Sequence, residues 1–457
     1  MSMDPLELAS SPELQRSARK LIRSQPHAKQ SDRRAFIDVS NALFNAYLHL
    51  QEYPVEVMRA LLPLIYDLTA KQWGADSILH TTLNLHARGI PANRLALQAM
   101  AAARRTNDFD LARDLMADLN ELEPDDLVVS LFLAQSEAAL GNFQRLEGLS
   151  FATRQSAVLS PWLIGEWTKL TLNNLLINEA RRWLELSADE AAVMIADQRI
   201  ASFESADPSF SIEANVISLD RDTRRWPLVE RSLKLGGAVP IRRRAVDGME
   251  LPEYALEHLG ASAEVAHIHG AGAIAVALSH IRILENFLST SQERIFVVED
   301  DAAPYFHFSY FDKILDETTS VDFLWVNERM SLQYTTTNPC DLTLCNPWQI
   351  LSARNNKVLG IGADGYFVNR EGATKLLENF SKDKVLGHID GQIAAYSANV
   401  DDSPVVTRSQ VAVKSLRAQL TDPRLLSDQA LSIPMVWSND HGSSNNIATS
   451  DLRRQSS

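Results

Sequence analysis

The sequence of 457 residues has little cysteine, no excess of positive charge and no long uninterrupted apolar run. Its two cysteines, Cys340 and Cys345, are too few for a disulfide framework. The net charge of −14 argues against a nucleic-acid partner, because general nucleic-acid binders are basic. No stretch reaches the ~18 consecutive apolar residues of a membrane span, and the N-terminal residues lack the apolar segment of a signal peptide. We therefore expect a cytoplasmic protein without a transmembrane segment, whose membrane contact is peripheral and at the inner face.

What the sequence does contain fits a soluble globular protein with packed cores, since 45% of its residues are hydrophobic and 22% are charged. Residues 1–35 are polar and mixed in charge, so we expect a flexible arm. Residues 438–457 are rich in serine and asparagine, so we expect a disordered tail. Between these ends, residues 36–200 have a helical pattern, whereas residues 211–430 alternate β-rich runs with helices.

The helical region contains an internal period. A bulky apolar residue recurs at intervals of 34 residues, at Phe109, Phe143 and Ile177. Three positions after each one stands a small or apolar residue: Ala112, Leu146 and Ala180. This spacing resembles that of tetratricopeptide repeats, in which a small residue lets two helices approach and a bulky one fills the groove. Such repeats would offer a concave surface to a protein partner; the alternative is an irregular helical bundle with a coincidental period.

The alternating region predicts an α/β sheet with helices on its faces. Ligands of such sheets bind beyond the carboxyl ends of the strands. One apolar run, Ile295–Val298, ends there in three acids, Glu299, Asp300 and Asp301. Packed carboxylates repel one another, and a bound cation removes that repulsion. The acid-tipped strand therefore indicates a cation site.

Two protein classes carry such an element, and the first is the receiver domain of response regulators. There the acids close the first strand of the domain, and a phosphorylated Asp ends a later strand. Here a whole α/β segment precedes the acids, and the next strand ends in Asn327, which cannot accept a phosphoryl group. The context argues against a receiver.

The second class fits in several places at once. Six segments occur in the order found in one family: NVISLDRDTRRWPLVERSL, RRAVDGMEL, ALSHIRILENFL, FVVEDDAAP, GADGYFVNREGATKLL and HIDGQI. Together they resemble glycosyltransferase family 25, which includes bacterial lipooligosaccharide galactosyltransferases and collagen galactosyltransferases. The resemblance implies a GT-A-type fold, a Rossmann-like nucleotide-sugar domain. It departs from the family before ALSH, where Ala273 and Ala275 stand in place of Glu and Gly.

The acids suit the chemistry that the resemblance implies. A nucleotide-sugar donor loses a diphosphate, whose charge a divalent cation can neutralise. Mn²⁺ or Mg²⁺ prefers the oxygen ligands that carboxylates, water and phosphate supply. Side chains alternate along a strand, so Glu299 and Asp301 can share a face from which Asp300 points away. We expect the metal on Glu299, Asp301 and His388; the alternative is an acidic strand end that caps a helix or pairs with arginine.

The resemblance also implies a set of donor-binding residues: Ser218, Asp220, Arg221, Asp247, His280, Glu299 and Asp300. Arg221 could hold phosphate with its planar fork, whereas we expect Arg225 to lie on a solvated helix face. Asp247 precedes a glycine and could serve only to form a turn. His280 could be a satisfied, half-buried histidine.

Transfer with inversion needs a base for the acceptor hydroxyl, and a carboxylate within hydrogen-bond reach can serve. We assign this role to Asp390. Trp325 and Trp348 could stack on an acceptor sugar, although such residues more often belong to a core.

The sequence thus predicts an α/β GT-A-type (Rossmann-like) glycosyltransferase domain after an all-α, tetratricopeptide-like domain. The expected activity is a metal-dependent, inverting transfer of a hexose, galactose from UDP-galactose by resemblance, to a glycan or glycoconjugate such as lipopolysaccharide. The alternative is a scaffold protein whose repeats bind a partner and whose transferase domain is degenerate, a reading motivated by Ala273 and Ala275.

Overall fold

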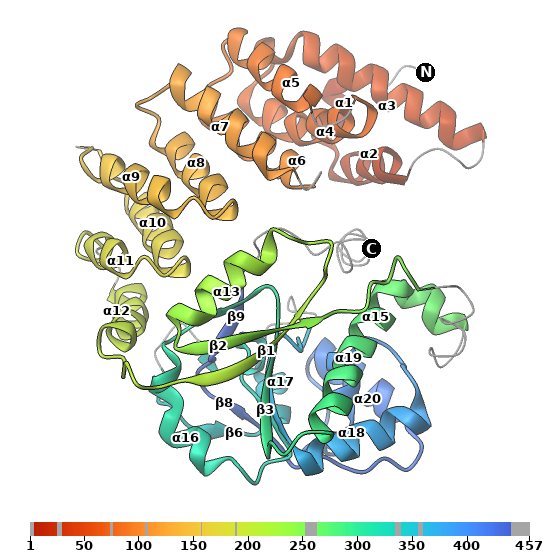
Figure 1. Ribbon diagram of the computed structural model, residues 1–457. Helices are drawn as coiled ribbons and strands as arrows, with labels where there is room; N and C mark the ends of the chain where they lie inside the picture. The colour runs from red at the N-terminus through yellow and green to blue at the C-terminus, as the bar shows by residue number, and fades with distance from the viewer. Residues whose placement is uncertain are drawn as a thin grey trace. The chain divides into compact units, whose positions relative to one another are not determined.

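The computed structural model describes residues 4–24, 30–73, 76–105, 108–156, 158–187, 190–251, 263–333, 340–354 and 360–439. The chain separates into two compact units, Met1–Leu159 and Ser160–Ser450, each with a hydrophobic core of its own (Figure 1). The boundary falls inside the region that the sequence marks as helical. The last helices of that region therefore belong to the same unit as the sheet.

The described part of the N-terminal unit is helical. It consists of α1 (Pro5–Ser10), α2 (Pro12–Ser24), α3 (Gln30–Leu48), α4 (Val55–Trp73), α5 (Asp76–Ala87), α6 (Ala92–Arg105), α7 (Phe109–Leu122), α8 (Leu127–Ala139) and α9 (Phe143–Arg154), with a short 3-10 turn between α3 and α4. The prediction of a flexible arm over residues 1–35 is corrected for residues 5–24, which form α1 and α2. Their apolar side chains Leu8, Ala18 and Ile22 are buried in the core of the unit. Amphipathic periodicity outweighs the polar composition here.

The 34-residue period coincides with helix starts. Helices α7, α9 and α11 (Ile177–Leu184) begin at Phe109, Phe143 and Ile177. The residues three positions later, Ala112, Leu146 and Ala180, are all buried. Within the first unit, α7 lies against α8, and α8 against α9. These observations support a helical-repeat interpretation, while the tetratricopeptide assignment stays a prediction.

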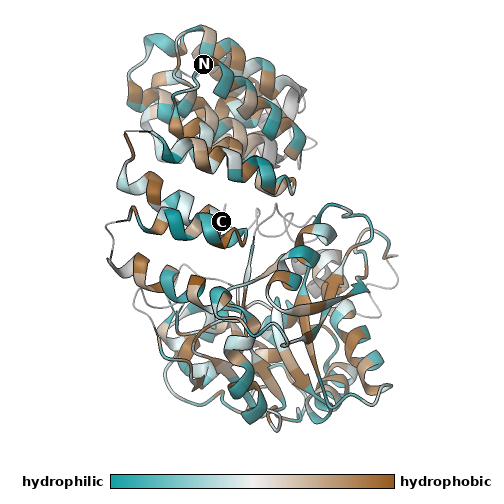
Figure 2. Ribbon diagram, turned by 60° about the vertical axis from the view of Figure 1, so that its left-hand side comes forward, coloured by the Kyte–Doolittle hydropathy of each residue, from teal (hydrophilic) through white to brown (hydrophobic). Residues whose placement is uncertain are grey.

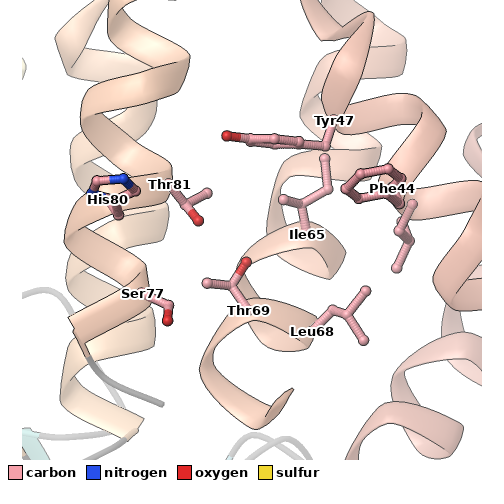
Figure 3. A pocket seen from close by; sticks show the side chains of 9 residues that line it. Phe44, Tyr47, Ile65, Leu68, Thr69, Ser77, His80 and Thr81 are labelled. Carbon is pink, nitrogen blue, oxygen red and sulfur yellow. The ribbon is translucent and has the colours of Figure 1, made fainter. Parts of the chain in front are cut away.

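A cavity of about 460 Å³ opens in the N-terminal unit between α3, α4 and α5 (Figure 3). One wall is apolar and the other carries hydroxyls and an imidazole; the lining residues are Leu43, Phe44, Tyr47, Ile65, Leu68, Thr69, Ser77, His80 and Thr81. Because the cavity belongs to the first unit, the acids of the α/β unit do not line it.

The second unit begins with α10 (Pro161–Asn173), α11 and α12 (Glu190–Glu204). Trp167 of α10 and Trp183 of α11 stack with ring centroids 5.4 Å apart, which fixes this helix pair. Arg199 of α12 is buried against the sheet region, where its Nε donates to the Tyr305 carbonyl at 2.9 Å. Its guanidinium also lies 4.1 Å from the centroid of the Tyr305 ring. These contacts join the last helices to the α/β fold.

The strands of the second unit form a mixed sheet. In the described residues it has seven strands in the order β2-β1-β3-β7-β5-β8-β6: β1 (Ile212–Ser218), β2 (Ala238–Arg244), β3 (Arg294–Glu299), β5 (Phe323–Trp325), β6 (Leu344–Cys345), β7 (Gly365–Asn369) and β8 (Asp428–Leu431). Strand β1 is parallel to β2 and β3, and β7 runs antiparallel between β3 and β5. A second, antiparallel pair joins β4 (Ala302–Pro304) to β9 (Val436–Ser438). Residues 440–457, most of the predicted tail, lie outside the described residues.

Helices cover both faces of the sheet, which is why its strands read as continuous apolar runs. Ile295 and Val297 of β3 share a core with α15 (Ala263–Leu288), α17 (Pro347–Ala353), α18 (Arg370–Asp383), α19 (Ile389–Ala395) and α20 (Arg408–Arg417). Phe296 and Val298 face the opposite core, with α13 (Arg225–Leu235) and α16 (Asp312–Glu317). Figure 2 shows the apolar colour concentrated in these strands. The predicted fold class, a Rossmann-like α/β domain preceded by an all-α region, is confirmed.

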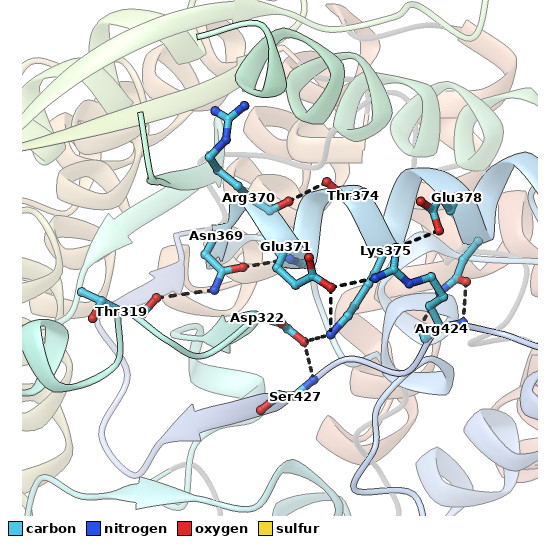
Figure 4. A network of polar contacts seen from close by, with 12 residues as sticks. Thr319, Asp322, Asn369, Arg370, Glu371, Thr374, Lys375, Glu378, Arg424 and Ser427 are labelled. Atoms are coloured by element: carbon cyan, nitrogen blue, oxygen red, sulfur yellow. Dashed lines mark hydrogen bonds and ion pairs between the residues drawn. The ribbon is translucent and has the colours of Figure 1, made fainter. Parts of the chain in front are cut away.

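A buried ion pair fastens α18 to the neighbouring strands (Figure 4). The Asp322 carboxylate, at the start of β5, accepts from Lys375 Nζ at 2.7 Å and from the Ser427 backbone N–H at 2.8 Å. Arg424 adds ion pairs to Glu371 and Glu378 of the same helix. This network sets the position of β7, which leads directly into α18.

One helical segment in the described residues, Gly270–Leu288, is long and apolar enough to cross a membrane by length and composition. Ile274, Ala277 and Leu284 of this segment lie in the core beneath the sheet. This burial is the ordinary behaviour of a core helix in an α/β domain.

Candidate functional site

The acids meet at one edge of the sheet. Strands β3 and β5 both run antiparallel to β7, so the carboxyl ends of β3 and β5 lie beside the amino end of β7. Glu299 is the last residue of β3 and Asp301 follows it; Glu328 and Arg329 follow β5, and Asp364 precedes β7. Three segments far apart in the sequence thus deliver charged side chains to one place.

Glu299 lies at the centre of three of the segments noted in the sequence. Its Oε1 is 3.4 Å from Nε2 of the buried His280, and His280 Nδ1 is 2.9 Å from the Tyr366 hydroxyl. Burial raises the pKa of Glu299, and the nearby Asp301 and Asp364 carboxylates raise it further, while His280 lowers it. The ALSH helix, the acidic strand and the GYFVN strand therefore meet through a single chain of contacts.

The ALSH helix also holds the AVDG turn. Ser279 Oγ accepts from the Val246 backbone N–H at 2.8 Å and donates to the Ala275 carbonyl at 2.8 Å. A Cβ at Gly248 would lie 3.0 Å from the backbone of Ala271, so the turn lies close to α15 just after its non-helical residue Gly270.

The predicted residues after β1 are engaged with one another. Arg221 Nε lies 2.8 Å from Asp247 Oδ2, and Asp247 also accepts from the Met249 backbone N–H at 2.9 Å. The exposed Asp220 lies 2.9 Å from Arg244 Nε. Ser218 is buried, and its hydroxyl has no hydrogen-bond partner among the described residues. This group lies beside the acids because β1 pairs with β3, with Ile217 opposite Glu299.

Asp300 turns away from Glu299 and binds Arg225. Its Oδ1 lies 2.9 Å from Arg225 Nη1, and Asp222 Oδ2 lies 3.1 Å from Arg225 Nε. The expectation that Arg225 lies on a solvated helix face is wrong, since its side chain is only 3% exposed. Burial raises the pKa of Asp300, an effect that Arg225 partly offsets. This pair anchors α13 to the end of β3.

Asp301 keeps one carboxylate oxygen without a partner. Its Oδ2 accepts from the Ser438 hydroxyl at 2.8 Å, whereas its Oδ1 is buried and has no hydrogen-bond partner in the described part of the chain. A buried carboxylate oxygen without a donor is costly unless a ligand or ion satisfies it.

Three residues that sequence reasoning missed complete the edge: Glu328, Arg329 and Asp364. Arg329 Nη2 lies 2.8 Å from Asp364 Oδ1, while Asp364 Oδ2 is buried and lacks a hydrogen-bond partner among the described residues. Burial raises the pKa of Glu328 to about 7, with a further increase from Asp364. The sequence signal available for Glu328 was its place in the segment NERM, residues 327–330, directly after the apolar run of β5.

The Asp390 carboxylate binds the backbone of the loop before β7. Its Oδ2 accepts from the backbone N–H groups of Ile361 at 3.1 Å and Gly362 at 2.7 Å, and its Oδ1 accepts from Gly391. Burial would raise the pKa of Asp390, but His388 and these N–H groups outweigh it, so the pKa is lowered. A carboxylate held in this way orders the loop and is a weak base.

The predicted metal ligands Glu299, Asp301 and His388 are not arranged as a preformed metal site. Among the residues that the structure describes, no group of three or more His, Cys, Asp or Glu side chains is arranged to hold a metal ion. Glu299 and Asp301 interact with each other, whereas His388 lies beside Asp390. A cation here would take ligands from outside the protein, such as water and phosphate.

The two candidate stacking residues belong to the core. Trp325 is fully buried, and its Nε1 donates to Asp428 at 3.2 Å. Trp348 is 4% exposed and donates to the Ser403 hydroxyl at 3.3 Å. Neither presents a ring face to a sugar.

Comparison with known proteins agrees with this geometry. Residues 212–390 match the family model of glycosyltransferase family 25, described as an LPS biosynthesis protein. No curated protein matches the chain. The matched segment starts with β1, contains the acids of β3 and the motif strand β7, and ends at Asp390. The α/β region of this chain, over residues 212–390, therefore carries the match to glycosyltransferase family 25, and this match indicates a glycosyltransferase.

Proposed function

We propose that the protein is a metal-dependent, inverting hexosyltransferase. It would move galactose from UDP-galactose to a glycan or glycoconjugate acceptor of the lipopolysaccharide type. The proposed setting is the cytoplasm, at the inner face of the membrane when the acceptor is lipid-linked. The observation that carries the proposal is the unpartnered, buried Oδ1 of Asp301 at the carboxyl end of β3, inside the segment that matches family 25.

The residues present suit a divalent cation that arrives with its substrate. Mg²⁺ and similar ions keep several waters and need only one or two carboxylates plus substrate phosphates. Asp301 would bind Mn²⁺ or Mg²⁺, and the neighbouring Glu299 carboxyl lies 3.4 Å from His280 Nε2. When bound, the cation would neutralise charge on the departing diphosphate.

The protein's own groups would orient the donor and take up a proton. Tyr366 bonds His280 Nδ1, and His280 Nε2 lies 3.4 Å from the Glu299 carboxyl, which would accept hydrogen bonds from sugar or ribose hydroxyls. Asp390, which we predicted as the base, accepts three backbone N–H groups. Glu328 has a pKa near the working range of a general base, so we propose it as a second candidate for that role.

Donor hydrolysis with and without metal tests the proposal. We expect UDP-galactose hydrolysis in Mn²⁺ that is lost in EDTA, and a loss of about a hundredfold or more in Asp301→Asn, because metal stabilisation of leaving-group charge is worth several kcal/mol. Asp316→Asn, an exposed acid on α16, is the matched control and should keep full activity. Undiminished turnover by Asp301→Asn in EDTA would contradict the mechanism.

The alternative function is a scaffold with a degenerate transferase domain. The observation that favours it is the burial of Ala273 and Ala275 in the core, where the family usually carries Glu and Gly. Nucleotide binding separates the two functions. Stabilisation by millimolar UDP with Mn²⁺ in a thermal-shift titration supports the enzyme, and no shift supports the scaffold.

A further inference from the structure

We infer that Arg329 is a fixed cation of the donor site and that its guanidinium binds the diphosphate of the donor. The inference rests on the proposed function, because it takes the ligand to be a nucleoside diphosphate sugar. It concerns a residue that lies after β5, outside the motifs that carry the family resemblance.

The turn after β5 and the loop before β7 position the Arg329 side chain. Asn327 Oδ1 accepts from the Met330 backbone N–H at 2.9 Å, and its Nδ2 donates to the Gly362 carbonyl at 2.8 Å, which ties the turn after β5 to the loop before β7. Gly362 has φ +79°, and a Cβ there would lie 2.5 Å from Arg329 Nε and Nη2. Glycine is needed both for the backbone angle and for the close approach of the guanidinium.

Carboxylates surround the guanidinium. The Asp364 carboxylate raises the pKa of Arg329 most, and Asp390 and Asp301 add to the effect. Burial raises the pKa of Asp364, an effect that the Arg329 guanidinium partly offsets. The side chain is still 30% exposed, so its outer edge is open to a ligand.

The unpartnered atoms of the cluster point to the kind of ligand. Asp301 Oδ1 and Asp364 Oδ2 are buried acceptors without donors, and Arg329 Nε is a buried donor without an acceptor, among the described residues. Two free carboxylate oxygens suit a cation, and a free guanidinium N–H suits an anionic oxygen. A metal-bound diphosphate carries both charges together. Arginine matches the oxygens of phosphate with its planar fork, which a lysine cannot do.

A purely structural role for Arg329 would consist of its ion pair with Asp364 alone. The two roles differ in what they do to ligands with and without phosphate. A structural defect would weaken the binding of any ligand of the site, whereas a lost phosphate contact would weaken UDP and spare uridine.

The experiment is calorimetric titration of the full chain with UDP and with uridine, in Mn²⁺ and in EDTA. We expect Arg329→Gln to weaken UDP binding about tenfold or more, the size of a charge-assisted hydrogen bond, and to leave uridine binding unchanged. Arg329→Lys should lose part of the UDP affinity, and it serves in place of Arg329→Gln if that variant does not fold. Arg424→Gln, which removes an arginine paired with two carboxylates of α18, is the control and should change neither affinity.

Equal weakening of UDP and uridine, or unchanged binding of both, would overturn the inference while leaving the proposed function in place. Absence of UDP binding by the wild-type protein in Mn²⁺ would overturn both. A selective loss of UDP affinity that persists in EDTA would support a contact between Arg329 and phosphate that does not depend on the metal.

Discussion

At the scale of single residues, the three consecutive acids after β3 have three different surroundings. Glu299 faces His280, Asp300 binds Arg225, and Asp301 keeps a free oxygen. Alternation along the strand separates the first two, and the turn after the strand directs the third toward Ser438. Three consecutive acidic residues therefore have three different roles. Glu299 makes a contact with a buried histidine, Asp300 forms a structural ion pair, and Asp301 offers a free oxygen to a ligand.

We expect the ionisation of Glu328 to make the free energy of unfolding depend on pH. Its carboxyl pKa is about 7 in the folded chain and near 4.5 when unfolded. The folded state therefore holds an extra proton between these values, so stability falls as pH rises from about 4.5 to 7. Glu328→Gln removes the cost of ionising this buried group. In EDTA, we expect the variant to be more stable than wild type by about 3 kcal/mol at pH 8 and by little at pH 4.5.

Urea denaturation at both pH values measures this difference. Glu317→Gln, an exposed acid on α16, is the control and should show no pH-dependent gain. An equal effect of Glu328→Gln at pH 4.5 and pH 8 would show that Glu328 ionises normally.

At the scale of elements, the sequence predicts what repeats or alternates and misses what depends on single long-range contacts. The continuous apolar run of β3, the 34-residue helix starts and the order of the family segments were all readable along the chain. Arg329 and Asp364 were not, because neither lies in a periodic pattern and their pairing requires β5 and β7 to be neighbours. The burial of Arg225 was missed for the same reason, since its partner Asp300 is distant in sequence.

The ion pair between Lys375 of α18 and Asp322, which precedes β5, is expected to stabilise the packing of these two elements. Lys375→Met leaves the buried Asp322 carboxylate with only its backbone donor, so we expect a loss of about 2 kcal/mol in the free energy of unfolding. Lys382→Met, an exposed lysine on the same helix, should stay within about 0.5 kcal/mol of wild type. If the pair is the cause, Asp322→Asn combined with Lys375→Met will cost less than the sum of the single changes. Additive losses in chemical denaturation would contradict it.

At the scale of the whole molecule, the change from helices to strands near residue 205 does not coincide with the division into compact units. Helices α10 to α12 belong with the sheet, because Arg199 is buried against Tyr305 and Arg231 donates to the Asn174 carbonyl at 3.1 Å. The His307 backbone N–H also donates to Ser202 at 3.1 Å. Composition cannot reveal this division, since the helices of both units have the same kind of sequence pattern.

Limited proteolysis of the full chain distinguishes the two boundaries. Proteases cleave exposed backbone with few contacts, and Val158, just before the division, is 79% exposed. Elastase should therefore cut first near residue 158 and leave a stable fragment that begins before α10, as intact mass would show. Arg199→Ala removes the buried contact between α12 and Tyr305, so in this variant cleavage should extend to residues 205–211. A first cut at 205–211 in the wild-type protein would mean that α10 to α12 are not held by the sheet.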